Sequence, residues 1–301
     1  MEKPKEMVIG NYAKLTLDFT FKKAFASEED KDLLIALLNA FLERKLAYPI
    51  TDVLIKNPYI QGQTIDSRGS ILDIRCQDAA NNSFIVEMQM SKQAYFFKRS
   101  LLYSSQSIVS SAKKGEDYDF NYPNVYSLNF LDFDVDIGDN RSNVVQYVSF
   151  SDEDCPATRY EYVNLVFVRL PRFRKSIEEC ETLQDKLLFS LRHAHEMESP
   201  PEQLHGNPFD RLFKVAKISN FTDMELSQYV SRAMFRADRK GEIDTARDEG
   251  IAIGKNEGIA IGEARGEARL LQVARQMKLE KMNSDLISRI TGLPKEDVER
   301  L

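Results

Sequence analysis

The sequence predicts an α/β or α+β fold in which helices flank a mixed central sheet, with a helical region after it. Helical runs and β-rich runs are interleaved up to about residue 170. From Pro171 onward the predicted elements are helices with charged faces. Interleaved strands and helices bury their apolar surfaces by packing the helices on the sheet. The 301 residues, 43% of them hydrophobic, suffice for one substantial core with smaller attachments.

Two helices are predicted first, over 18–26 and 30–46, because their apolar residues recur at helical spacing. Pro49 ends this region. Runs rich in β-forming residues then predict strands, with a hairpin turn at Ala79 to Asn82 and one long helix interrupting them. The predicted strands are 50–56, 70–77, 83–90, 125–133, 144–150 and 160–170, and the interrupting helix is 92–114.

The chain is expected to have three parts: a sheet-containing domain over 1–170, a helical region over 171–240, and a tail over 241–301. The tail has a glycine at every fourth position in the near repeat EGIAIGKNEGIAIGEARGEARL. This spacing aligns the glycines along one side of a helix, yet each glycine costs about 1 kcal/mol of helix stability relative to alanine. Two interpretations follow: a helix that packs against a second copy of the chain, or a loosely helical linker.

Composition and charge restrict the function classes. The chain has 41 basic and 47 acidic residues, so any attraction to nucleic acid must be local. Its three cysteines are far apart and form no CxxC pair, which argues against a disulfide framework and against a zinc site. The charged N-terminus and the lack of a long apolar run predict a soluble cytoplasmic protein with no membrane partner.

The chemistry centres on two acids in the predicted hairpin, Asp73 and Glu87. If the turn is centred on Ala80, these acids lie opposite each other and share one face, because side chains alternate along a strand. Each strand is apolar on its other face, where Cys76 is expected in the core. Like charges in this position repel each other, and Mg²⁺ or Mn²⁺ would turn the repulsion into binding. The alternative is an ordinary surface strand with Arg75 beside Asp73.

The helix that follows adds positive charge, since no acidic residue occurs from Met88 to Gly115. A basic helix next to a metal-binding acid pair is typical of a site for a phosphodiester. Arg99 and Tyr103 lie four residues apart and share a helix face; a structural hydrogen bond between them is the alternative. The residues predicted to contact DNA are Lys92, Lys98, Arg99 and Tyr103.

The segments SILDIRCQD, FIVEMQM and RSLLY, in this order after a helix, resemble the PD-(D/E)XK nucleases. The resemblance is to the Rpn group of recombination-promoting nucleases, also called PD-(D/E)XK nuclease family transposases. It extends to the entry helix DFTFKKAF, the LLNAFL run, the segment KKGEDYDFNYPNVYSLNFLDF and the glycine-repeat tail. It implies a restriction-endonuclease-like core and cleavage of DNA that depends on Mg²⁺.

In this resemblance Asp73 and Glu87 are the metal ligands, and Gln89 stands where the superfamily has a catalytic lysine. Glutamine offers hydrogen bonds but no charge; the Rpn group resembles this chain in having glutamine there. Asp18 and Lys22 match the group's N-terminal motif. The predicted function is therefore a metal-dependent DNA endonuclease, and the alternative is a catalytically weak or inactive DNA-binding scaffold that assembles through its tail.

Overall fold

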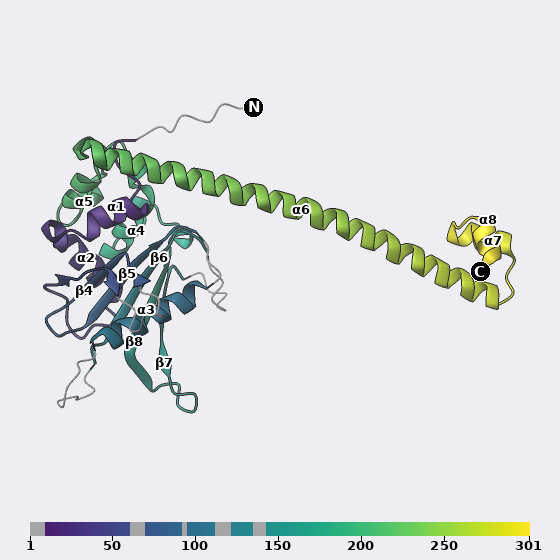
Figure 1. Cartoon of the computed structure of the whole chain (residues 1–301), viewed down its shortest axis with the longest axis horizontal. Coiled ribbons are helices and arrows are strands. Elements are labelled where there is room, and N and C mark those ends of the chain that lie inside the picture. The colour runs from purple at the N-terminus through teal and green to yellow at the C-terminus, as the bar shows by residue number, and fades with distance from the viewer. Residues whose placement is uncertain (1–9, 61–69, 92–94, 112–121, 135–142) are drawn as a thin grey trace. The chain divides into compact units, whose positions relative to one another are not determined.

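The computed structural model describes residues 10–60, 70–91, 95–111, 122–134 and 143–301. These fall into two compact units, 1–233 and 234–301. The first unit is built on a six-stranded mixed sheet with the strand order β1-β4-β5-β6-β8-β7 (Figure 1). The strands are β1 (Leu54–Ile55), β4 (Ile74–Gln77), β5 (Ser83–Gln89), β6 (Val125–Leu131), β7 (Val145–Ser151) and β8 (Arg159–Arg169).

The sheet combines both kinds of pairing. Strands β5, β6 and β8 run parallel, while β4 pairs antiparallel with β5 and β7 pairs antiparallel with β8. Every residue of β6 is buried, as is usual for a central strand covered on both faces. A separate short pair, β2 (Tyr59–Ile60) and β3 (Ser70–Ile71), is also antiparallel. These observations confirm the predicted mixed sheet flanked by helices.

One face of the sheet carries the main core. It is covered by α1 (Asp18–Phe25), α2 (Lys31–Leu42), α4 (Leu183–His193) and α5 (Phe209–Ala216). The helices supply aromatic and branched side chains to a single cluster with the sheet residues. Members of this cluster include Phe21, Leu34, Phe41, Ile74, Cys76, Phe84, Val86, Leu128, Leu188 and Leu212. Cys76 is fully buried there, as the strand pattern predicts.

The opposite face is covered by α3 (Phe96–Ser111), which packs closely because its buried positions include small serines. Ser107 Oγ lies 2.8 Å from Ser83 Oγ on β5, and Ser100 Oγ donates to Asn129 Oδ1 on β6 at 3.2 Å. This finding corrects the prediction that the β4–β5 hairpin has one polar face. Ile85 lies on the face of β5 that the alternation marks as polar. It is nevertheless fully buried, because apolar side chains of α3 pack against it.

The limits of three predicted elements also need correction. The helix predicted over 30–46 begins after a 3₁₀ turn (Glu28–Asp30) and ends at Leu42, and the strand predicted over 50–56 is reduced to Leu54–Ile55. The strand predicted over 70–77 is interrupted at Leu72 and Asp73. This bend places Leu72 in the cluster beneath α3, whereas Ile74 lies in the main core. Strict alternation therefore fails at the bend.

The second unit contains most of α6 (Asp223–Leu279), a single helix of 57 residues that runs through the glycine repeat. Two short helices, α7 (Ser284–Thr291) and α8 (Lys295–Arg300), pack with its C-terminal part around Ala274, Ile287 and Val298. Gly292 ends α7 with a left-handed conformation, φ 74°, which glycine adopts without strain. Among the described residues, no helix is both long enough and apolar enough to cross a membrane.

Candidate active site

The β4–β5 hairpin brings the two predicted acids together. Ile74 pairs with Val86 and Arg75 with Ile85, so the register continued by one residue places Asp73 opposite Glu87. The turn that sets this register has Asn81 in the left-handed region, φ 65°, and its N–H donates to the Asp78 carbonyl. A three-residue loop with such a residue at its end is a common hairpin connection.

Each acid is held by the strand that carries the other. The backbone N–H of Asp73 donates to Glu87 Oε1 at 3.1 Å. In return, the backbone N–H of Met88 donates to Asp73 Oδ2 at 2.8 Å. The two side chains are therefore held next to each other by the backbone of the hairpin.

This arrangement is electrostatically unfavourable when both acids are charged. Glu87 is only 3% exposed, and its burial, followed by the nearby Asp73 carboxylate, raises its pKa to about 8. Burial also raises the pKa of Asp73, although Lys22 and the Met88 N–H favour its charged form. Without an added cation the pair therefore retains a proton near neutral pH, since two adjacent buried carboxylates do not both ionise readily.

Lys22 supplies the positive charge nearest to the pair. Its Nζ lies 2.7 Å from Asp18 Oδ1 within α1 and 3.0 Å from Asp73 Oδ1 on the hairpin. Partial burial opposes the charge on Lys22, but the two carboxylates outweigh that cost and raise its pKa. The N-terminal residues Asp18 and Lys22 thus reach the acid pair, with Lys22 bridging helix and strand.

Gln89 follows Glu87 on the same side of β5 and contacts it directly. Its Nε2 donates to Glu87 Oε2 at 3.0 Å, so both oxygens of Glu87 accept a hydrogen bond. On α3, Arg99 lies close enough to Glu87 to favour its charged form, which partly opposes the rise of its pKa. The guanidinium also donates to Tyr103 Oη, from Nε at 3.2 Å and from Nη2 at 3.1 Å.

The remaining predicted DNA contacts are less closely associated with the acids. Lys98 is exposed on α3, and its Nζ lies 5.7 Å from the centre of the Tyr95 ring. Lys92 lies outside the described residues. The structure therefore brings together Asp18, Lys22, Asp73, Glu87, Gln89 and Arg99, with Tyr103 held by Arg99, and leaves Lys98 on the outer surface of the helix.

A family model described as PD-(D/E)XK nuclease family transposase matches residues 15–246, which include all the residues of the candidate active site. The chain belongs to this family. No curated protein and no solved structure that was compared matches it. As a PD-(D/E)XK nuclease family transposase, the protein has a nuclease-like fold and a transposase-associated function.

In the resemblance described in the sequence analysis, Glu87, Met88 and Gln89 would correspond to the acid, any residue and lysine of the PD-(D/E)XK signature. The amide of Gln89 contacts Glu87 as a hydrogen-bond donor, but it adds no positive charge. The positive charges of the site instead come from α1 and α3, through Lys22 and Arg99. Positive charge therefore reaches the acids from the helices rather than from position 89.

The donor set suits a hard divalent cation. Asp73 and Glu87 present carboxylate oxygens, and one or two carboxylates are enough for Mg²⁺ when water and phosphate complete its coordination. The Lys22 ammonium, which already bridges Asp18 and Asp73, shows that this corner of the site favours a positive charge. No cluster of three or more His, Cys, Asp or Glu side chains suited to a metal ion occurs within the described ranges.

Sequence reasoning missed two parts of this site. It did not find the ion pair between Lys22 and Asp73, because nothing in the local pattern relates α1 to the hairpin. It also missed the Met88 N–H as a hydrogen-bond donor to Asp73. The break between β3 and β4 leaves the side chain of Asp73 free to accept this bond, and no residue type in the sequence signals that break.

Proposed function

We propose that this protein is a divalent-metal-dependent DNA endonuclease that hydrolyses phosphodiester bonds and is associated with recombination or mobile elements. The observation that carries the proposal is the pairing of the partly buried Asp73 with the buried Glu87, held side by side and next to Lys22. Membership of the PD-(D/E)XK nuclease family transposases supports the reaction class. We assign the nuclease-like domain to residues 1–170, followed by a helical region over 171–240, whose α4 and α5 pack on the sheet, and a tail over 241–301.

Asp73 and Glu87 would hold the cation, Mg²⁺ or Mn²⁺. When bound, such a cation polarises the scissile phosphate and activates water. The chain's own groups prepare this site. The Met88 N–H and the Asp73 N–H fix the two carboxylates, and Gln89 orients Glu87 through its amide. Lys22 stabilises the charge of Asp73 and places an ammonium group where a phosphate oxygen would arrive.

The DNA backbone would lie along the exposed side of α3, with Lys98 and Arg99 as phosphate contacts and Tyr103 holding Arg99. The sequence also predicts Lys92 as a phosphate contact, and this residue lies outside the described residues. The chain has no acidic side chain from Met88 to Gly115. Such a stretch suits phosphate binding, because phosphate binding depends on local positive charge rather than on the net charge of the protein.

A plasmid-nicking assay with purified full-length protein in Mg²⁺, Mn²⁺ or EDTA tests the proposal. We expect nicking with either metal, none in EDTA, and loss of nicking in Asp73→Asn and Glu87→Gln. Asp52→Asn is the matched control, because Asp52 is an exposed acid that pairs with Lys31 away from the site. Nicking that survives both site substitutions would show that the activity belongs to another site or to a contaminant.

The second candidate function is a DNA-binding scaffold with weak or no turnover, favoured by Gln89 in place of a lysine. It predicts metal binding without cleavage. In either case we propose self-association through α6. Its glycines at 250, 254, 258, 262 and 266 have open space around them, and the isoleucines at 251, 253, 259 and 261 are each more than half exposed. The glycine stripe would let the backbone of a second helix approach closely, and exposed isoleucines beside the stripe would pack against that helix.

A further inference from the structure

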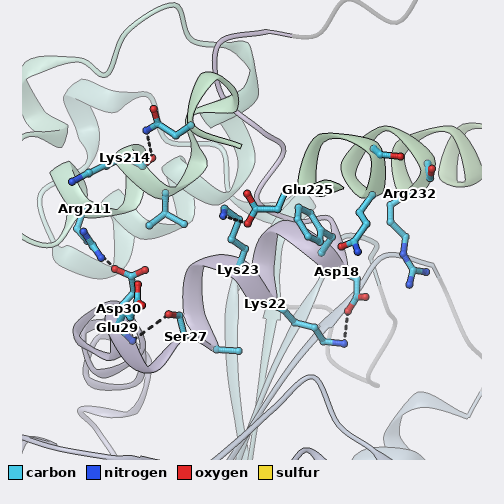
Figure 2. Close-up of a pocket in the computed structure, with 17 residues that line it drawn as sticks. Asp18, Lys22, Lys23, Ser27, Glu29, Asp30, Arg211, Lys214, Glu225 and Arg232 are labelled. Carbon is cyan, nitrogen blue, oxygen red and sulfur yellow. Dashed lines mark hydrogen bonds and ion pairs between the residues drawn. The ribbon is translucent and has the colours of Figure 1, made fainter. Parts of the chain in front are cut away.

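A groove of about 1100 Å³ opens beside the candidate active site, within the first unit. Its walls are α1, the 3₁₀ turn after it, α5 and the first turns of α6 (Figure 2). Asp18 and Lys22 line it, and Lys22 also bridges to Asp73. Lys22 therefore lies between the groove and the acid pair, so a polymer bound in the groove would pass close to Asp73.

The groove is polar and slightly cationic. Its five lysines and arginines face four acids, and three of those acids are neutralised by ion pairs within it. These pairs are Lys22 with Asp18, Lys23 with Glu225, and Arg211 with Asp30. Lys214 and Arg232, both exposed, form no ion pair with any described residue. The charge left for a ligand is therefore positive at Lys214 and Arg232, with one exposed acid, Glu29, remaining in the lining.

One wall presents a row of hydrogen-bonding groups. Gln228, Ser231 and Arg232 are three and four residues apart on α6, so they share a helix face. In Figure 2 the Arg232 side chain leaves α6 on the side of α1, where Asp18 and Lys22 lie. Few apolar side chains line the groove, whereas small-molecule pockets are mostly apolar. An open polar groove with spaced cations fits a phosphodiester backbone.

We propose that this groove binds the phosphodiester backbone of the DNA strand on the side of the acid pair opposite to α3, with Arg232 as its principal phosphate contact. Lys214 binds a phosphate further along the strand, and Gln228 and Ser231 donate hydrogen bonds to phosphate oxygens between them. This inference rests on the proposed nuclease function, because it names where the substrate of that site is held.

Binding is tested separately from cleavage, with the full-length chain and a fluorescent DNA oligonucleotide, single-stranded or duplex, in anisotropy titrations at several salt concentrations. We expect Arg232→Gln to weaken binding roughly fivefold or more and to lower the salt slope by about one, as the loss of one phosphate contact does. Arg232→Lys should retain most of the binding. The matched control is Arg247→Gln, an exposed arginine further along α6 that does not line the groove.

The outcomes distinguish this inference from the proposed function. If Arg232→Gln binds DNA as the wild type does while nicking still depends on Asp73, the groove is not the binding site and the nuclease proposal stands. If Arg232→Gln weakens binding but the wild type never nicks DNA with metal, the groove assignment stands and the nuclease proposal fails. Equal losses in Arg232→Gln and Arg247→Gln would show a general charge effect and overturn the assignment.

Discussion

Nζ of Lys22 lies 3.0 Å from Oδ1 of Asp73, which ties the first helix of the domain to the hairpin that carries the two acids. The same ammonium lies 2.7 Å from Asp18, so it balances two carboxylates at once. The side chain is half-buried, and without its charge the Asp73 carboxylate would keep, among the described residues, the hydrogen bond from the Met88 N–H. Lys22 is therefore the residue through which tertiary structure completes the site.

Replacement of Lys22 by methionine should lower metal-dependent nicking by about 100-fold, the usual effect of removing one positioned donor from a reacting anion. The loss should appear mainly in kcat if the ammonium meets the phosphate in the transition state. Lys31→Met is the control, since Lys31 pairs with Asp52 on the surface. Equal activity in Lys22→Met and wild type would limit Lys22 to a structural role.

The acid pair predicts a pH-dependent stability. Because the pKa of Glu87 is raised to about 8, the folded state binds more protons than the unfolded chain between the ordinary glutamate pKa and about 8. The free energy of unfolding should fall as pH rises through that window. Thermal unfolding in EDTA from about pH 5 to about pH 9 should show this decrease.

Two comparisons assign this slope to the acid pair. Mg²⁺ should reduce the fall of the unfolding free energy with pH, because a bound cation favours the charged carboxylates. Glu87→Gln should remove most of this fall. Glu28→Gln, at an exposed acid in the 3₁₀ turn, should leave it unchanged. A melting temperature that rises with pH in EDTA would contradict the expected protonation of Glu87.

A lysine at position 89 should alter how Glu87 titrates. Gln89 Nε2 lies 3.0 Å from Glu87 Oε2, so an ammonium group there would favour the charged carboxylate and lower the pKa of Glu87. Gln89→Lys should therefore shift the acidic limb of the pH–rate profile of nicking to lower pH. Lower activity at every pH would instead show that the amide of Gln89 is required.

Replacing glycines of the α6 repeat with alanine is expected to have two opposite effects, one on helix stability and one on self-association. Gly254 and Gly258 have no atom near the position of an added Cβ, so Gly254→Ala/Gly258→Ala should stabilise the helix by about 1 kcal/mol per site within one chain. If a second copy packs its backbone against the stripe, the same methyl groups should weaken self-association, measured by analytical ultracentrifugation. Gly241→Ala, equally open but outside the repeat, should affect only helicity.

The sequence alone determined the elements whose signals are local. The helix at Lys31–Leu42, the hairpin around Ala80 and the strands β5, β6 and β8 follow from apolar periodicity and turn chemistry, which act over a few residues. The pairing of Asp73 with Glu87 was also predictable, because a short turn fixes the register of the two strands it joins. The acid pair is thus largely a property of the hairpin.

Only the tertiary structure decided what surrounds that pair. The burial of Glu87 depends on α3 covering the face that the strand pattern marks as polar, and the charge of Asp73 depends on Lys22 arriving from α1. The groove between α1 and α6 likewise joins segments from distant parts of the chain. Contacts between distant segments are set by how whole elements pack, which no local spacing of residues encodes.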